Sequence, residues 1–204
     1  WDTATSDLED ALKEKKLSYV VNAGEGAFYG PKIDIKLKDA LGREWQCATI
    51  QCDFSLPERF GLKYVNEQGT EGRPIMIHRA ILGSLERFIG TLIEHYGGAF
   101  PVWLAPTQVV IIPIRSDHEE YALRVKDGLQ KAGVRVIIDS RNESLGKRIR
   151  EGTVKKVPYL LVVGDKEAQE NKVAVRKYGQ GDQGARELQL FIDQIQDEIV
   201  SKKF

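Results

Sequence analysis

The chain has 204 residues and a formal net charge of zero, with 42% hydrophobic and 29% charged residues, as in ordinary globular proteins of one or two domains. This balance excludes a disordered chain, and no apolar stretch approaches the length that spans a bilayer. The two cysteines, Cys47 and Cys52, lie five residues apart in one expected strand, so we expect neither a disulfide nor a zinc pair. These features favour a reducing, cytoplasmic location.

The first part of the chain predicts a helix followed by an antiparallel hairpin. Residues 5–17 have the capped, amphipathic pattern of a helix, and 18–22 form a short β-prone stretch. After a glycine-rich loop over 24–31, residues 32–38 alternate polar and apolar side chains, which is typical of a half-exposed strand. Residues 43–54 supply a second strand of similar length, so the two are expected to pair.

The stretch 74–96 is expected to run from a short buried strand into a helix. An apolar run over 74–77 turns polar at His78 and Arg79, and apolar residues then recur at helical spacing up to Gly97-Gly98. Gly83 and Ser84 interrupt this stripe with small side chains, where the backbone can approach a ligand or another element. The stripe, which we expect to face a core, comprises Ile81, Leu82, Leu85, Phe88, Ile89, Leu92 and Ile93.

The second part alternates strand and helix patterns, which predicts a mixed or parallel α/β sheet covered by helices. Strands are expected over 108–114, 134–138, 159–163 and, as an edge, 172–176; helices are expected over 121–129, 145–154 and 188–200. The linker 100–107 combines bulky apolar residues with two prolines, and we place the domain boundary there, giving domains 1–106 and 107–204. Basic residues gather in 135–156, a candidate surface for an anionic ligand.

Neither of the common phosphate-binding loops is present. Gly146-Lys147 matches the end of a P-loop, but Arg141 occupies the position that requires glycine. The glycine spacing of a dinucleotide-binding turn is also missing.

Several strings resemble one known family. HRAILGSLERF (78–88) resembles motif 3 of the class II aminoacyl-tRNA synthetases, in the form carried by threonyl-tRNA synthetases. EGAFYGPKIDI, WQCATIQCDF and the linker pattern FPxWLAPxQ are similar to the same family, while DSRNESLGKRIRE and VPYLLVVGDKE resemble its anticodon-binding domain. The resemblance implies an α+β chain: part of an antiparallel-sheet catalytic domain over 1–106, then an α/β anticodon-binding domain with a mixed sheet over 107–204.

The resemblance implies roles for individual residues. Arg87 would clamp the triphosphate of ATP, Lys32 would lie near the nucleotide, and Tyr29 would lie at the amino-acid pocket. The further substrate-binding residues implied are Gln46, Thr49, Gln51 and Ser84. Strict strand alternation puts Thr49 and Gln51 on one face and Gln46 on the other, so this assignment requires a bulge or a strand end.

The resemblance also implies a zinc ion that holds threonine, with His78 as a ligand, and magnesium bound with ATP. In the family the other two zinc ligands, a Cys and a His, lie upstream with motifs 1 and 2 and the editing domain. This chain offers one of the three ligands. Since it begins at Trp1 rather than Met, we expect a C-terminal portion of a longer enzyme that does not activate threonine alone.

For the second domain, the resemblance implies that Asn142 and Glu167 read anticodon bases, with the RNA backbone held by Arg141, Lys147, Arg150, Lys155 and Lys156. The expected function is that of a threonine–tRNA ligase acting in protein biosynthesis on tRNA(Thr), ATP and threonine, as a homodimer in the full-length enzyme and without a membrane. Two alternatives remain: a non-catalytic tRNA- or RNA-binding module derived from a synthetase, and another synthetase specificity such as prolyl.

Overall fold

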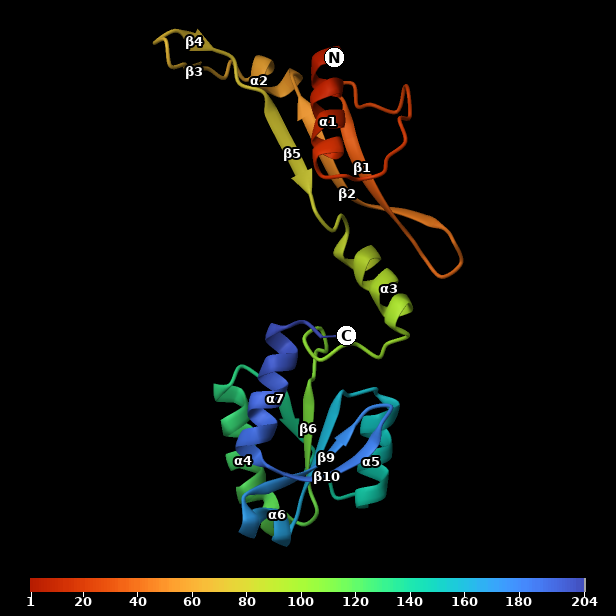
Figure 1. The fold of residues 1–204 in the computed structure, drawn as a ribbon, viewed down its shortest axis with the longest axis vertical. Helices are drawn as coiled ribbons and strands as arrows, with labels where there is room; N and C mark the ends of the chain where they lie inside the picture. Colours follow the sequence, from red (N-terminus) through yellow and green to blue (C-terminus); the bar gives the residue numbers. More distant parts are fainter. Residues whose placement is uncertain (204) are drawn as a thin grey trace. The chain divides into compact units, whose positions relative to one another are not determined.

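The computed structural model describes residues 1–203 and divides into two compact units, Trp1–His95 and Tyr96–Phe204 (Figure 1). In the described residues, no helix is long and apolar enough to cross a membrane. The two cysteines are both free thiols, as expected from their position in one strand.

The first unit is built on a three-stranded antiparallel sheet in the order β1-β2-β5. Its helices are α1 (Asp2–Glu14) and the short α2 (Ser55–Arg59), and it also holds a small hairpin and most of α3 (Leu85–Tyr96). The strands of the unit are β1 (Lys32–Lys38), β2 (Glu44–Asp53), β3 (Tyr64–Val65), β4 (Glu71–Gly72) and β5 (Met76–Ala80). The hairpin expected from the alternation of 32–38 and 43–54 is therefore present.

Three expectations for this unit were wrong. Residues 18–22 form no strand, because no neighbouring strand pairs with them and Val20 is 84% exposed. His78 lies inside β5 rather than at its end, and α3 begins at Leu85, since residues 81–84 form bends. The apolar stripe of α3 faces no core: none of its residues is buried, and Ile81, Leu85, Ile89 and Ile93 are all exposed.

The second unit is a five-stranded mixed sheet in the order β10-β9-β8-β6-β7. β6 pairs in parallel with β7 and β8, whereas β9 pairs antiparallel with β8 and β10. The strands are β6 (Val109–Pro113), β7 (Val136–Ile138), β8 (Tyr159–Val163), β9 (Lys172–Lys177) and β10 (Gly181–Glu187). The mixed sheet is confirmed, but β9 is not its edge strand, because β10, which the sequence did not predict, covers its outer side.

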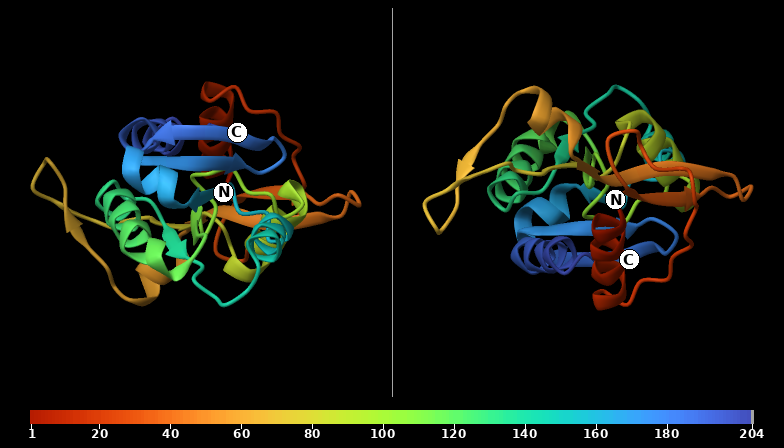
Figure 2. Two further views of the ribbon diagram at one scale, coloured as in Figure 1. Left: turned by 90° about the horizontal axis from the view of Figure 1, so that it is seen from below. Right: turned by 90° about the horizontal axis from the view of Figure 1, so that it is seen from above.

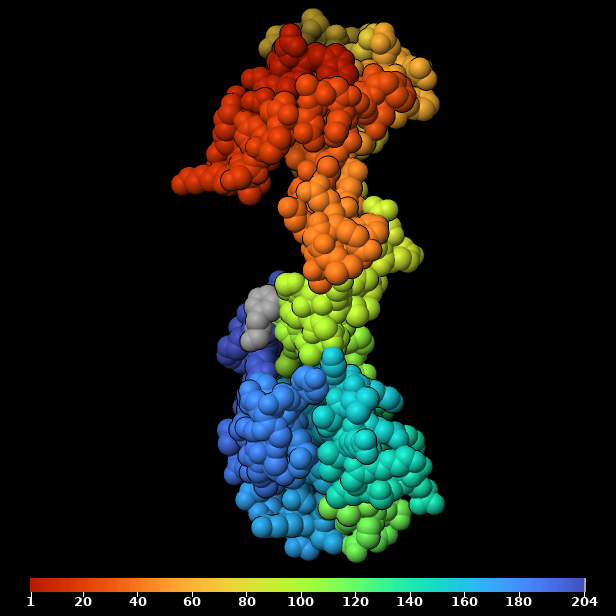
Figure 3. Space-filling view, turned by 90° about the vertical axis from the view of Figure 1, so that its right-hand side faces the viewer, coloured from red at the N-terminus to blue at the C-terminus, as the bar shows by residue number. Residues whose placement is uncertain are grey.

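Helices cover both faces of this sheet (Figure 2). Alternate residues of β6, β8 and β9 join the larger core with α4 (Glu119–Lys131) and α7 (Leu188–Val200). The opposite residues of β6 and β8 pack with Leu145 and Ile149 of α5 (Leu145–Val154) in a smaller cluster. Figure 3 shows the α5 side (cyan) bordered by β9 and β10 (blue). The short elements η1 (Ser116–His118) and α6 (Asp165–Glu170) complete the unit, and α6 was also not predicted.

The linker before β6 packs on the second unit. Val102 is buried in the larger core, and Gln108 donates its side-chain amide to the Val102 carbonyl oxygen at 2.8 Å. Arg135, just before β7, donates to the carbonyl oxygens of Trp103 and Ala105 at 2.9 and 3.0 Å. These contacts attach the linker to the second unit, which begins at Tyr96, whereas the functional boundary at 106/107 stays a prediction.

Candidate functional site

One face of the three-stranded sheet gathers polar side chains because β2 contains a bulge. Ile35 pairs with Ala48, but the next residue, Lys36, pairs with Gln46, so Cys47 has no partner in β1. The extra residue turns Gln46 to the face that carries Thr49 and Gln51. The bulge that the sequence required is present, and Gln46 donates its amide to the Thr49 hydroxyl at 2.9 Å.

Asp34 is the centre of the hydrogen-bond network on this face. Its carboxylate accepts from Lys32 Nζ at 2.5 Å, Gln46 Nε2 at 2.7 Å and Thr49 Oγ1 at 2.7 Å. Partial burial opposes ionisation of Asp34, but the hydrogen bonds from Lys32 and Thr49 outweigh it and lower the pKa. Sequence reasoning missed Asp34, although its spacing of two from Lys32 already placed both side chains on one face.

Tyr29, Gln51 and His78 lie together at the other end of the face. The Tyr29 hydroxyl donates to Gln51 Oε1 at 3.0 Å, and its ring lies edge-on to the His78 ring with centroids 6.2 Å apart. His78 pairs across the sheet with Gln51, and its Nε2 atom lies 2.8 Å from Oδ2 of the buried Asp53. Burial disfavours the charged form of Asp53, but hydrogen bonds from Leu56, His78 and Ser55 together lower its pKa.

Arg87 reaches β2 from the first turns of α3. Its guanidinium lies over the Trp45 ring, 5.5 Å from the ring centroid, and donates to the Gln46 carbonyl oxygen at 3.0 Å. Ser84 accepts a hydrogen bond from the Arg87 backbone N–H at 3.3 Å and donates to Glu86 at 2.8 Å. In this structure the Ser84 hydroxyl therefore caps the helix that carries Arg87.

Gly83 allows α3 to start against the bulge. Its φ is +63°, and a Cβ atom there would lie 2.6 Å from the Cys47 carbonyl oxygen. The small residue thus serves close approach to another element, one of the two explanations that the sequence left open.

A metal site is only partly provided by the described residues. Within 1–203, no three His, Cys, Asp or Glu side chains come close enough to hold a metal ion. His78 does suit a zinc ligand: its side chain is 38% exposed, and the carboxylate of Asp53 binds one ring nitrogen, an arrangement common behind zinc-bound histidines. Any further protein ligands would have to come from outside these residues.

In the second unit, Asn142 and Glu167 follow the carboxyl ends of two parallel strands. Asn142 lies between β7 and α5, while Glu167 lies in the first turn of α6, directly after β8. Since both strands pair in parallel with β6, their carboxyl ends lie at the same edge of the sheet. Glu167 accepts the Gly164 backbone N–H through one oxygen at 3.0 Å, which orients the carboxylate.

The basic residues predicted to hold an RNA backbone differ in their partners. Arg141 pairs with Asp139 and Glu151, both at 2.7 Å, and Lys147 pairs with Glu143 at 2.6 Å. Lys156 donates to the Gly97 carbonyl oxygen. Arg150 and Lys155 are exposed and form no ion pair within residues 1–203, so their charges are the most available to an anionic ligand.

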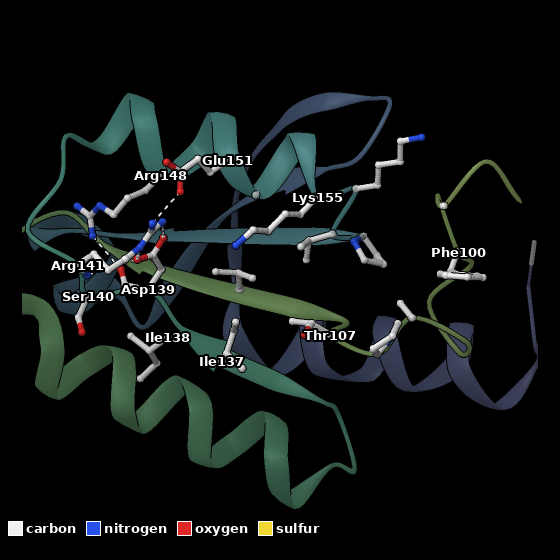
Figure 4. A pocket seen from close by; sticks show the side chains of 18 residues that line it. Phe100, Thr107, Ile137, Ile138, Asp139, Ser140, Arg141, Arg148, Glu151 and Lys155 are labelled. Atoms are coloured by element: carbon white, nitrogen blue, oxygen red, sulfur yellow. Dashed lines mark hydrogen bonds and ion pairs between the residues drawn. The ribbon is translucent and has the colours of Figure 1, made fainter. Parts of the chain in front are cut away.

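A cleft of about 560 Å³ lies between α5, β7 and the linker (Figure 4). Its apolar part includes Phe100, Ile137 and Val157, and its charged part includes Arg141 and Lys155. Deeper in the unit, the buried Arg148 donates to the carbonyl oxygens of Pro113, Ile114 and Asp139 at 2.9, 3.4 and 2.9 Å. This side chain ties the ends of β6 and β7 to α5, and so fixes the segment that leads to Asn142.

Comparisons with known proteins match both units. Residues 3–96 match the family "tRNA synthetase class II core domain (G, H, P, S and T)", and residues 108–198 match the family "Anticodon binding domain". The solved RNA binding domain of threonyl-tRNA synthetase from Cryptosporidium parvum is similar over 96% of the chain and 49% of its own, with 41% identity and a TM-score of 0.83. Together, the two matched ranges place the chain among the class II aminoacyl-tRNA synthetases.

The curated relatives identify the family within this class. The chain is 55% identical to the threonine–tRNA ligase of Carboxydothermus hydrogenoformans over 203 residues, and 61% identical to that of Syntrophotalea carbinolica over 176 residues. It belongs to the threonyl-tRNA synthetase family. Prolyl-tRNA synthetase from C. parvum is less similar, with 25% identity and a TM-score of 0.63 over 88% of the chain and 41% of its own. The chain spans about a third of the length of the curated relatives it matches, 32% and 28% for the two named here.

Proposed function

We propose that this chain supplies part of the catalytic site and the anticodon-binding domain of a threonine–tRNA ligase. The observation that carries the proposal is the polar face of the first unit. Asp34 accepts hydrogen bonds from Lys32, Gln46 and Thr49, and Tyr29 bonds to Gln51, which pairs with Lys32. The family membership of the chain supports the same conclusion. The proposal includes a functional boundary at 106/107, a cytoplasmic location and a homodimer for the full-length enzyme.

In this proposal the polar face binds threonine and ATP. The threonine carboxylate attacks the α-phosphorus of ATP and pyrophosphate leaves. A hydroxyl of the tRNA terminal adenosine then loses its proton and takes the threonyl group, and AMP leaves. Arg87 would neutralise triphosphate charge together with magnesium. Lys32 is paired with Asp34, so it would act as an oriented rather than a freely moving cation. Positioning and charge neutralisation supply the acceleration, and no covalent nucleophile is required.

His78 would be one of three zinc ligands, with the other two from outside this chain. Zinc with three protein ligands keeps open coordination positions for the amino and hydroxyl groups of threonine. The face itself contributes Tyr29 and Gln51 beside His78, where they would orient the bound amino acid. Valine has the shape of threonine but lacks the hydroxyl, so this recognition would reject it.

The second unit would bind the anticodon loop of tRNA(Thr). Asn142 and Glu167 present an amide and a carboxylate at one edge of the sheet, and such groups read the edges of unstacked bases. Arg150 and Lys155, with contributions from Arg141, Lys147 and Lys156, would hold the RNA backbone.

The testing experiment is filter binding of the 204-residue chain to a threonine tRNA transcript and to anticodon-swapped transcripts at one salt concentration. We expect the swaps to weaken binding, and Asn142→Ala or Glu167→Gln to remove the difference between transcripts. Gln at 167 keeps an oxygen for the Gly164 N–H, so α6 should stay capped. Glu170→Gln, on the same helix, is the matched control and should preserve discrimination. Equal binding of all transcripts by the unsubstituted chain would refute the base-reading assignment.

Catalysis is tested separately by threonine-dependent exchange of pyrophosphate into ATP. The 204-residue chain alone should give no exchange, because it supplies one zinc ligand and lacks motifs 1 and 2. The full-length gene product should give exchange that is lost with Arg87→Met. A full-length product that binds tRNA(Thr) but gives no exchange would instead favour the non-catalytic tRNA-binding module.

A further inference from the structure

The contact between Asp53 and His78 joins two strands on the proposed substrate face. Asp53 ends β2, His78 lies within β5, and Gln51 is the residue directly opposite His78. Asp53 therefore lies on the same face, two residues further along β2. Its Oδ2 atom is 2.8 Å from His78 Nε2, and the residue is only 1% exposed.

The carboxylate of Asp53 is held in one orientation by the start of α2. Its Oδ1 atom accepts the backbone N–H groups of Ser55 and Leu56 at 2.8 and 3.0 Å. With Oδ1 committed to these two donors, Oδ2 is the oxygen that faces the histidine ring. An ionised carboxylate can only accept hydrogen bonds, so Nε2 of His78 must carry the hydrogen.

This contact decides which ring nitrogen has a lone pair. A neutral imidazole carries one N–H, and with the hydrogen on Nε2 the lone pair is on Nδ1. Within residues 1–203, Nδ1 of His78 has no hydrogen-bond partner, and the side chain is 38% exposed. A neutral imidazole nitrogen is a ligand that zinc prefers, and a carboxylate on the opposite nitrogen fixes the orientation of the ring.

We propose that Asp53 is the positioning residue of the metal site: it fixes the tautomer and ring orientation of His78, so that Nδ1 is the atom offered to the metal ion. The metal assignment rests on the proposed function, whereas the tautomer does not. Sequence reasoning missed Asp53, because nothing local marks it as a partner of a residue twenty-five positions later.

The test uses the ring nitrogen resonances of the histidines in the 15N-labelled 204-residue chain at pH about 8.5, where an unperturbed histidine is neutral. His118 is an internal reference, because its Nδ1 accepts the Arg115 backbone N–H at 3.1 Å and its Nε2 lies 3.0 Å from Asp165. We expect His78 to show the same Nε2–H pattern as His118. A predominantly Nδ1–H pattern for His78 would overturn the proposal.

The decisive variant is Asp53→Asn, which preserves shape. The two N–H groups of α2 require an oxygen, so the amide NH2 should face His78 and donate to Nε2. The tautomer of His78 should then invert to Nδ1–H, while His118 stays unchanged. Asp53→Ala, which offers neither group, should give a mixture of both forms. His78 keeping the pattern of the unsubstituted chain in Asp53→Asn would show that Asp53 does not set the tautomer.

Zinc titration of the same samples tests the donor atom. Zinc should shift the Nδ1 resonance of His78 in the unsubstituted chain and leave it unshifted at the same concentrations in Asp53→Asn. A shift at Nε2, or no shift at zinc concentrations that move the imidazole of N-acetylhistidine, would overturn the donor-atom assignment. Asp53→Asn should keep unchanged tRNA affinity in the filter assay, so failure of this proposal is distinguishable from failure of the tRNA-binding function.

Discussion

The guanidinium of Arg87 donates to the backbone carbonyl oxygen of Gln46, forty-one residues earlier in the chain, at 3.0 Å. The same group lies 5.5 Å from the ring centroid of Trp45. The side chain proposed to bind triphosphate is therefore held over an aromatic ring at the edge of the bulge. A phosphate chain that binds Arg87 should draw it from this ring, and Trp45 can report the movement.

We predict that ATP with magnesium changes the fluorescence of Trp45, measured in a Trp1→Phe, Trp103→Phe background. Arg87→Met should weaken ATP binding about tenfold or more, because a charge-assisted hydrogen bond contributes about 1.5 kcal/mol or more. Arg43→Met is the matched control, since Arg43 also lies over the Trp45 ring at 5.7 Å, and it should keep the response. An undiminished response in Arg87→Met would contradict the assignment.

Gly83→Ala should destabilise the first unit by about 1–3 kcal/mol, since the residue has a φ of +63° and the new methyl group would meet the Cys47 carbonyl oxygen. Gly90→Ala, in the exposed interior of α3, adds a Cβ with no atom within 4 Å apart from the nearby helix backbone and its chain neighbours. It should stabilise the unit by about 0.5–1 kcal/mol. Urea unfolding followed by Trp45 fluorescence measures both. If the two substitutions changed the free energy of unfolding equally, the close approach of Gly83 to the Cys47 carbonyl oxygen would not limit the residue at position 83.

Asp39 predicts an acid-sensitive hairpin. A hydrogen bond from Trp45 Nε1 lowers the pKa of Asp39 most strongly, and hydrogen bonds from Arg43 and Leu41 lower it further. Burial opposes this lowering. The resulting pKa is about 2 in the folded chain, against 3.8 in the unfolded chain. Because the folded pKa is depressed, this stabilisation is complete above pH about 4 and is lost as the pH falls toward 2. Thermal unfolding between pH 5 and 2 should show a smaller decline for Asp39→Asn than for the unsubstituted chain. As a control, substitution of an exposed carboxylate, Asp7→Asn, should leave the full decline in thermal stability. If Asp39→Asn declined as steeply as the unsubstituted chain, Asp39 would not be the source of the acid sensitivity.

The partners of the basic residues predict different salt effects on tRNA binding. Arg150→Ala or Lys155→Ala should each reduce the dependence of log affinity on log salt by about 0.7–0.9 per lost phosphate contact. Arg141→Ala should change this slope less, because Arg141 is already paired with Asp139 and Glu151. Filter binding across a salt series measures all three. If Arg141→Ala reduced the salt dependence more than Arg150→Ala, RNA binding would have to break the ion pairs of Arg141 with Asp139 and Glu151.

Local sequence patterns predicted the regular elements better than their pairing. The strands 32–38 and 159–163 and the helices 145–154 and 188–200 were predicted to the residue, because alternation and helical spacing are local signals. β10 was missed, since its two glycines and charged residues hide a strand that exists by pairing with β9. α6 is too short and polar to give a helical pattern in the sequence. Residues 18–22 are β-prone, but they form no strand because they have no partner strand.

The polar face of the first unit was also predicted only in part, because it too depends on how the strands pair. Alternation placed Thr49 and Gln51 together and showed that Gln46 needs a bulge, but only the pairing of β1 with β2 locates it at Cys47. The roles of Asp34 and Asp53 in the hydrogen-bond network depend on cross-strand neighbours, which a single strand pattern does not specify.

The bulge at Cys47 also divides the hairpin into two parts with different tolerance of insertions and deletions. Between the bulge and the turn at 39–43, matched changes of length in both strands would shorten or lengthen the hairpin tip without moving Thr49, Gln51 or Asp53. Deleting Cys47 alone would restore regular pairing with Gln46 still on the face of Thr49, but it would remove the extra residue and the carbonyl oxygen that Gly83 approaches. One unpaired residue thus sets where the chain length can vary during evolution and where it cannot.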